Sequence, residues 1–375
     1  MAKAVKKKSP SIGKLDITFL SFVLILLTVG LVMLFSASYA YSYEHYGNSY
    51  KFISRQAAFA VVGVAAMLIV SRIDYHFWRK FCWILYARSI VLLGILLIVP
   101  PMVKGMDVKR WFVVGPVNFQ PSEIAKFSII LLFASLLAAN IKQIKSFKFI
   151  AFLILLLGAV CGLVILEPHL SATVLIFSIG VVMMIVAGLP KRYVFGGLGA
   201  GAGLLAVAIA AIGYGSDRIK YWLDPWQDQT GLGFQTIQSL LAIGSGGVLG
   251  RGIGQSRQKY LWLPEPHNDF IFSIVCEELG LIGAVVIILL FCLLVWRGFT
   301  IAMRSGDRFG SLLALGLTFQ VGLQAMLNIW VVTNTIPNTG ISLPFFSYGG
   351  TSLLILLAEM GIILSVSRGA SIEKT

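Results

Sequence analysis

The carboxylate of Asp269 stands in a context that could support chemistry. It belongs to the segment Leu263–Phe270, in which two prolines stiffen the chain and His267 lies two residues before the aspartate. A carboxylate beside a histidine, at the start of an apolar helix, is a candidate general base. The structural alternative is strong, because aspartate is a good helix N-cap that the helix dipole stabilises.

A second group of ionisable residues lies in the first half of the chain. It comprises two motifs and a lysine: Lys109-Arg110-Trp111, Gln120-Pro121-Ser122-Glu123 and Lys126. Glu123 and Lys126 are three residues apart, which places them on one face of a helix. Ser122 after Pro121 also predicts an ordinary capped helix start, with Lys126 extending to the membrane interface. Spacing alone leaves a functional site and a structural cap equally open.

A third segment combines prolines, glycines and hydroxyl groups. It runs through Pro337–Pro344 and continues in Phe345–Ser352, which includes Ser347. Irregular backbone at membrane depth is tolerated only where it is buried in protein or lines a cavity. The segment therefore predicts one wall of the same pocket, and a re-entrant connection without a site is the alternative.

A glycine-rich run, Gly244–Gly254, has some likeness to a nucleotide-binding loop. No strand precedes it, and its spacing misses the dinucleotide fingerprint, so we exclude that function. A flexible basic loop near lipid phosphates fits better, with Arg251 as the candidate contact.

The elements that position these residues must be membrane helices. Of 375 residues, 58% are hydrophobic and only 12% are charged, whereas soluble domains have roughly 25% charged residues. The apolar residues form runs of about 20, the length that crosses roughly 30 Å of hydrocarbon as a helix. The composition predicts an all-α polytopic membrane protein.

The pattern predicts about ten transmembrane helices within a single domain, 16–368. They are expected near 16–39, 52–71, 81–103, 122–140, 149–166, 170–189, 193–213, 269–296, 309–333 and 344–367. A basic N-terminus, 1–15, precedes this domain, and a short tail, 369–375, follows it. The large loop 214–268, between helices 7 and 8, is expected to lie on the membrane surface as short amphipathic helices.

Charge predicts the orientation of these helices. Lysine and arginine gather in alternate short segments, including 1–15, 72–80, 142–148 and 297–308, and positive loops stay in the cytoplasm. Both termini should therefore be cytoplasmic, with the loop 214–268 and the three polar clusters on the extracytoplasmic side. The net charge of +14 does not indicate nucleic acid as a partner, because the basic residues form no single patch.

Taken together, the clusters resemble the SEDS family (shape, elongation, division and sporulation proteins; FtsW/RodA/SpoVE). The likeness runs in order from about 12 to 368. It rests on Lys109-Arg110-Trp111, Gln120-Pro121-Ser122-Glu123, Gly250–Ser256, Leu263–Phe270 and Pro344–Ser352. One departure is Pro168-His169-Leu170-Ser171, where many members have Pro-Asp-x-Gly. This departure and Asn268 beside Asp269 favour the division and sporulation branch without assigning it.

The resemblance implies a peptidoglycan glycosyltransferase in a bacterial cytoplasmic membrane, polymerising lipid II together with a monofunctional class B penicillin-binding protein. Other division or sporulation membrane proteins are implied as partners. It implies a catalytic role for Asp269 and substrate-binding roles for Arg110, Trp111, Glu123 and Lys126. His267, Ser347 and Arg251 are further candidates for substrate binding. The leaving diphosphate would be stabilised by these cations or by a divalent ion, Mg²⁺ or Mn²⁺.

Two other functions remain open from the sequence. A flippase for the same lipid would be expected to show inverted repeats and charges near the midplane, and we find no convincing repeat between the halves. A non-catalytic scaffold for a transpeptidase is the other alternative. The gathering of polar residues on one face favours an enzyme.

Overall fold

The computed structural model describes residues 13–99, 110–114, 117–194, 196–197, 216–231, 233–260 and 262–369. In this part of the chain, long helices dominate, as predicted. The helices are α1 (Ile17–Tyr46), α2 (Lys51–Val70), α3 (His76–Arg79), α4 (Cys82–Ile98), α5 (Pro121–Ala139), α6 (Phe147–Leu166), α7 (Leu170–Val186), α9 (Ser216–Leu223), α10 (Phe234–Gly246), α11 (Ile271–Met303), α12 (Arg308–Val332) and α13 (Gly350–Gly369). Two 3₁₀ helices are η1 (Ile141–Lys145) and η2 (Pro225–Asp228).

Seven of the described helices are long and apolar enough to cross a membrane: α1, α2, α5, α6, α11, α12 and α13. The apolar helices α4 and α7 are somewhat shorter. These nine helices correspond to nine of the ten predicted, and the chain is a multi-pass membrane protein. Most of the predicted seventh helix, 193–213, lies outside the described residues. Within the loop 214–268, the expected short helices are α9, η2 and α10.

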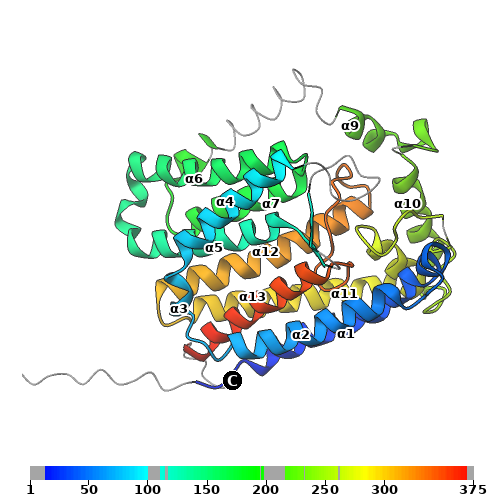
Figure 1. Ribbon diagram of the computed structural model, residues 1–375, viewed down its shortest axis with the longest axis horizontal. Helices are drawn as coiled ribbons and strands as arrows, with labels where there is room; N and C mark the ends of the chain where they lie inside the picture. Colours follow the sequence, from blue (N-terminus) through cyan, green and yellow to red (C-terminus); the bar gives the residue numbers. More distant parts are fainter. Residues whose placement is uncertain are drawn as a thin grey trace, which may run out of the picture.

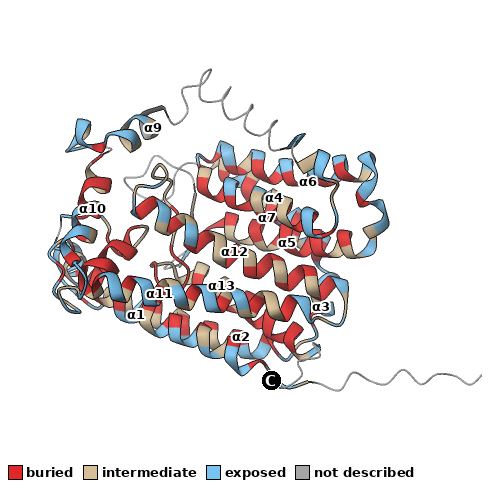
Figure 2. Ribbon diagram, turned by 180° about the vertical axis from the view of Figure 1, so that it is seen from behind, coloured by how far each residue is buried: buried red, intermediate tan, exposed pale blue. Residues whose placement is uncertain are grey.

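The long helices lie roughly parallel to one another in a single bundle (Figure 1). α1 and α2 form one edge, α4 and α6 the other, and α13, α12 and α5 lie between them. Buried residues are concentrated on α5, α12 and α13, whereas α2 and α11 keep many exposed apolar residues (Figure 2). Exposed apolar side chains are stable in contact with lipid tails, which explains why the outer helices need no polar face.

Both ends of the described chain meet at one end of this bundle. Asp16 caps α1 by accepting a hydrogen bond from the Phe19 amide at 2.9 Å, and its carboxylate accepts another from Arg297 Nε at 2.9 Å. The Asp16 amide donates to Ser367 Oγ of α13 at 3.3 Å. The two termini therefore start from the same face, which agrees with the charge pattern.

Several predicted helix limits were wrong, among them the end of the eighth helix, which continues to Met303 rather than ending at 296. The tenth helix begins at Gly350 rather than at 344, because residues 334–349 form an irregular segment. The first helix continues to Tyr46 rather than ending at 39, and it stops where Gly47 takes φ +65° and bonds back to the Tyr43 oxygen. A glycine in this left-handed conformation is a common helix terminator.

A two-stranded hairpin was not predicted. β1 (Phe112–Val114) pairs antiparallel with β2 (Val117–Phe119), with Phe112 opposite Phe119 and Val113 opposite Asn118. The hairpin reaches α13, where Thr351 Oγ1 donates to the Asn118 oxygen at 2.7 Å. It connects the start of α5 to the start of α13 and so helps to build the site described next.

Candidate active site

A pocket of about 370 Å³ lies at the end of the bundle opposite the chain termini. All three polar clusters of the sequence contribute to it. Its walls include Arg110, Trp111, Glu123, Lys126, His267, Asp269 and Ser347, together with Gly340 to Pro344. The size is within the range of small-molecule sites, roughly 300–1,000 Å³. The prediction that this segment forms a wall of the same pocket is confirmed for residues 340–345 and 347–352.

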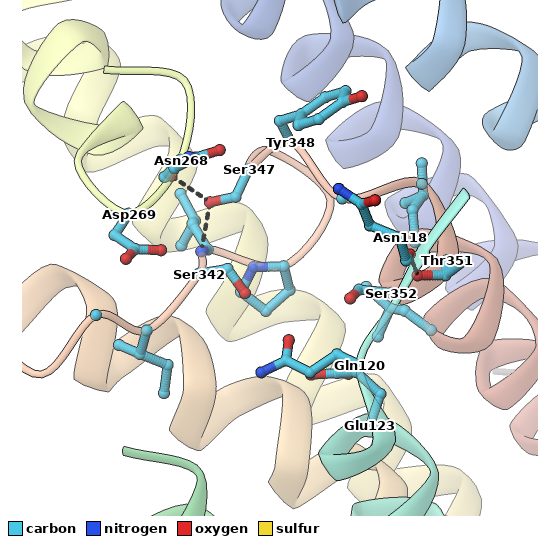
Figure 3. Close-up of a pocket in the computed structure, with 18 of the residues that line it drawn as sticks. Asn118, Gln120, Glu123, Asn268, Asp269, Ser342, Ser347, Tyr348, Thr351 and Ser352 are labelled. Carbon is cyan, nitrogen blue, oxygen red and sulfur yellow. Dashed lines mark hydrogen bonds between the residues drawn. The ribbon is translucent and has the colours of Figure 1, made fainter. Parts of the chain in front are cut away.

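The main chain around Asp269 is fixed by hydrogen bonds from α12 and from the segment before α13. Asn328 Nδ2 donates to the Asp269 oxygen at 2.7 Å. Ser347 Oγ donates to the Asn268 oxygen at 2.7 Å and accepts from the Leu343 amide at 2.8 Å (Figure 3). Ser347 therefore joins the two loops that form the pocket, and it belongs to the supporting structure as well as to the lining.

The Asp269 carboxylate is not used as a helix cap. The N-cap of α11 is Phe270, and no side chain caps this helix end. Among the described residues the carboxylate has no hydrogen-bond or salt-bridge partner, and it faces the pocket (Figure 3). The structural alternative for Asp269, that of an N-cap, is therefore wrong.

Burial and the neighbouring Glu265 raise the pKa of Asp269 to about 6, although the charge of Arg110 lowers it. An isolated aspartate has a pKa of about 3.9. A carboxylate that is a stronger base than usual, yet still ionised near neutral pH, suits proton abstraction at physiological pH.

Glu123 and Lys126 form a buried ion pair at the start of α5. Their Oε2 and Nζ atoms are 2.9 Å apart, and Lys126 is only 3% exposed. Lys126 Nζ also donates to Gln324 Oε1 at 3.0 Å, which ties α5 to α12. The prediction that Glu123 and Lys126 share one helix face is confirmed. The alternative that Lys126 extends to the membrane interface is wrong, because its side chain is buried in the protein. The predicted Ser122 cap is also wrong, because the N-cap is Gln120 and no side chain caps the helix.

Arg110 reaches the site from the segment before β1. One of its NH2 groups donates to the Pro168 oxygen, in the turn between α6 and α7. The neighbouring Glu167 is 1% exposed. Its burial raises its pKa to about 8, against the lowering effect of Arg110. Glu167 is therefore largely protonated at pH 7, so it contributes little negative charge beside Arg110.

His267 lies within a group of aromatic rings. Its ring centroid is 4.3 Å from that of Phe52 and 4.9 Å from that of Tyr41, and the residue is 3% exposed. Burial, with a smaller effect of His45, lowers the pKa of His267 to about 4. The ring is therefore neutral at pH 7 and contributes shape and aromatic surface, not charge.

Arg251 is the one predicted site residue that does not line the pocket. Its Nε lies 3.7 Å from Glu277 Oε1 and donates to the Ser245 oxygen at 3.2 Å. It belongs to a separate buried cluster, in which Glu278 receives hydrogen bonds from Lys259 Nζ at 3.0 Å and Ser36 Oγ at 2.7 Å. Glu277 and Glu278 are both buried.

Three polar residues of α12 were missed by the sequence reasoning. Gln320, Gln324 and Asn328 repeat every four residues along one face of an otherwise apolar helix. This spacing was available in the sequence and indicates a polar stripe toward the protein interior. On α1 and α2, Tyr41, Phe52 and Arg55 also line the pocket and were not predicted.

Within the described ranges, no three His, Cys, Asp or Glu side chains lie close enough together to hold a metal ion. In the same part of the chain, the positive charges that line the pocket are those of Arg55, Arg110 and Lys126.

These features define a class: a multi-pass helical membrane protein with a polar pocket at a bundle end. In the residues that the structure describes, this pocket is built around a carboxylate without a hydrogen-bond partner and flanking cations. The family model described as "Cell cycle protein" (FtsW, RodA, SpoVE) matches residues 17–372. The chain belongs to this family.

Curated relatives match over nearly the whole chain. Stage V sporulation protein E of Bacillus subtilis is 41% identical, over 97% of this chain and 98% of the relative. The probable peptidoglycan glycosyltransferase FtsW of Geobacter metallireducens is 38% identical, over 95% of both chains.

Solved structures match as well. One solved structure has a TM-score of 0.79 and 29% identity to this chain. It is described as "Structural coordination of polymerization and crosslinking by a peptidoglycan synthase complex". That match covers 94% of this chain and 98% of the other. The rod shape determining protein RodA of Thermus thermophilus has a TM-score of 0.70 and 28% identity, over 96% of this chain and 98% of that one.

Proposed function

We propose that this protein is a peptidoglycan glycosyltransferase that polymerises lipid II, the undecaprenyl-diphosphate-linked disaccharide peptide. The observation that carries the proposal is the Asp269 carboxylate, which is unbonded within the described residues and faces a pocket that also presents Arg110 and Lys126. The name of the relative from Geobacter, a probable peptidoglycan glycosyltransferase, supports the same activity.

The reaction needs one base. Asp269 accepts the proton of the acceptor 4-hydroxyl as that oxygen attacks the donor anomeric carbon. The bond from this carbon to the diphosphate oxygen breaks, and the diphosphate leaves with the electron pair. Arg110 and Lys126 stabilise the charge that develops on it. A single displacement from an α-linked donor inverts the centre and forms a β-linkage.

The localisation follows from the same geometry. A lipid-linked donor stays in the membrane while its sugar reacts at the surface, so a pocket at a bundle end suits it. With both termini in the cytoplasm, as the positive loops indicate, this pocket opens on the extracytoplasmic side of a bacterial cytoplasmic membrane. A monofunctional class B penicillin-binding protein, a transpeptidase, is the proposed partner, in line with the solved synthase complex.

The test is polymerisation of lipid II by the purified protein with its transpeptidase. Asp269→Asn should lower the rate by about 10²-fold or more, the contribution of a general base. Glu44→Gln, at an exposed acid of α1 that is not among the residues lining the pocket, is the control and should keep full activity. Full activity of Asp269→Asn, at normal expression, would remove Asp269 from the mechanism.

The same preparation distinguishes an enzyme from a carrier. In liposomes with lipid II on one side only, a polymerase forms glycan from the lipid exposed to its pocket. A flippase moves the lipid across without forming polymer, and that result would refute the proposed activity.

A further inference from the structure

The pocket extends to both sides of Asp269, and the two sides are built from different helices. On one side are Arg110 and Lys126, at the hairpin and the start of α5. On the other are Tyr41 of α1 and Phe52 and Arg55 of α2. α13 lies between α2 and α5 in the bundle (Figures 1 and 2). The cations of the pocket are therefore divided between two flanks.

The α2 flank is firmly attached to the loop that carries Ser347. Residues 52, 55, 56 and 59 share one helix face by their spacing. Gln56 Nε2 donates to the Ser347 oxygen at 3.2 Å, and Gln56 Oε1 accepts from the Gly349 amide at 3.1 Å. This bidentate contact fixes the rotation of α2, so that Arg55, on the same face, is placed at the pocket.

Arg55 has no acidic partner. It is exposed, and it makes no hydrogen bond or salt bridge with any residue that the structure describes. Lys126, on the other flank, is by contrast paired with Glu123. An exposed guanidinium at the rim of a pocket is well suited to bind a phosphate or diphosphate in bidentate fashion.

Aromatic rings line the same pocket as Arg55 and Asp269. Phe52 lies 4.3 Å from His267 and 4.8 Å from Tyr348, measured between ring centroids. The Tyr348 amide donates to the His267 oxygen at 2.9 Å, which holds these two residues together. Since the apolar faces of sugars pack on aromatic side chains, as apolar ligand surfaces do in most pockets, this surface can carry a disaccharide that ends at Asp269.

The chemistry requires two such flanks. When two lipid-linked disaccharides are coupled, each brings a diphosphate and a lipid chain, but only the donor loses its diphosphate. The acceptor keeps its diphosphate, one disaccharide away from the 4-hydroxyl that reacts. One cation set must therefore stabilise a leaving group near Asp269, and another must hold an intact diphosphate farther away.

We propose that Arg55, with the rings of Phe52 and Tyr348, forms the acceptor subsite, and that Arg110 and Lys126 belong to the donor subsite. This inference rests on the proposed function. The acceptor diphosphate binds Arg55, its sugars lie on the rings, and its 4-hydroxyl reaches the Asp269 carboxylate. Nothing on the acceptor breaks except the O–H bond, whose proton passes to Asp269.

The test separates the two subsites kinetically. A lipid II analogue capped at the 4-hydroxyl can act only as donor, so in large excess it couples once to each unmodified lipid II. The initial rate of this coupling is measured in the complex with the transpeptidase. Varying the concentration of lipid II gives the KM of the acceptor, and varying the concentration of the analogue gives the KM of the donor. Arg55→Gln should raise the acceptor KM at least about 10-fold, the loss of one charge-assisted contact, with the donor KM unchanged.

Three further variants complete the experiment. Arg72→Gln, at an exposed arginine just beyond the other end of α2, is the matched control and should change neither KM. Arg55→Lys should recover part of the acceptor affinity. Tyr348→Leu, which removes a ring but no charge, should also raise the acceptor KM. This variant tests the same subsite if Arg55→Gln does not fold.

A rise in the donor KM alone with Arg55→Gln, or two KM values equal to those of Arg72→Gln, would overturn the assignment. Absence of any coupling by the unmodified complex would instead refute the proposed function itself. The two failures are therefore distinguishable.

Discussion

Asn328 ties the main chain of Asp269 to the loop that follows α12. One side-chain amide group, Nδ2, donates to the Asp269 oxygen at 2.7 Å and to the Ile341 oxygen at 2.6 Å. Asn328 is fully buried in α12. A rigid helix thus sets the position of the candidate base through its backbone, which leaves the carboxylate itself for chemistry.

Asn328→Leu should therefore lower kcat more than it changes KM. Leucine has a similar volume but donates no hydrogen bond, and a misplacement of the base by about 1 Å can cost roughly 10²-fold in rate. Thr300→Val, which removes only an exposed hydroxyl bonded within α11, is the control for general destabilisation. An unchanged kcat in Asn328→Leu would show that Asn328 does not position Asp269.

The polymerisation rate should fall on the acid side of about pH 6. Asp269 works as a base only when ionised, and its raised pKa of about 6 means that the ionised form is lost as the pH drops through that value. Glu265→Gln removes the negative neighbour that contributes to this rise, so the acid limb should move to lower pH. Glu44→Gln should leave the limb in place. A limb that does not move in Glu265→Gln would contradict the electrostatic coupling.

Much of this architecture was predictable because membrane helices are specified by long apolar runs, and the limits of α2, α5 and α12 were each correct to within one residue. The three clusters were also expected to form one pocket, and they do. The reason is that only 12% of the residues are charged, so a few carboxylates and cations beside helix starts stand out in the sequence.

The remaining features depend on tertiary packing, which leaves a weak trace in one sequence. Arg55 and Phe52 look like an ordinary helix start at an interface, and only the contact of Gln56 with Ser347 and Gly349 directs that face to the pocket. The hairpin β1–β2 has strands of three residues, too short for a period-2 pattern. Arg251, in a glycine-rich basic loop, looks like a ligand contact in the sequence. In the structure it is close to Glu277, twenty-six residues away, and lies outside the pocket.

The Glu123–Lys126 pair should show the energetics of a buried ion pair. Lys126→Met leaves Glu123 uncompensated beside α12, and breaking such a pair costs about 3–5 kcal/mol. The double variant Glu123→Gln with Lys126→Met removes both charges and should recover a large part of that loss. Lys80→Met, at an exposed lysine, should have little effect.

Thermal unfolding in detergent of the single, double and control variants measures these differences. If the double variant is no more stable than Lys126→Met alone, the two charges do not compensate each other in the folded protein.

Gly280 provides a test of how the loop before Asp269 is attached to α11. It interrupts the helix with φ +67°, and a Cβ there would lie 2.2 Å from the Gly250 nitrogen. This approach lets the Leu281 amide donate to the Gly247 oxygen at 2.9 Å and the Gly252 amide to the Glu278 oxygen at 2.9 Å. Only glycine permits both the backbone conformation and the contact.

Gly280→Ala should therefore destabilise the protein, because the loop must move away from α11 or the helix must change its bend. Gly94→Ala is the matched control: this α4 glycine has no atom within 4 Å of an added Cβ, and alanine favours a helix by about 0.5–1 kcal/mol over glycine. The two variants make the same chemical change with opposite expected signs. Equal melting temperatures of the two variants would mean that the close approach of Gly250 and Gly280 does not hold the loop. A lower melting temperature for Gly280→Ala, together with reduced polymerisation, would link this contact to the geometry at Asp269.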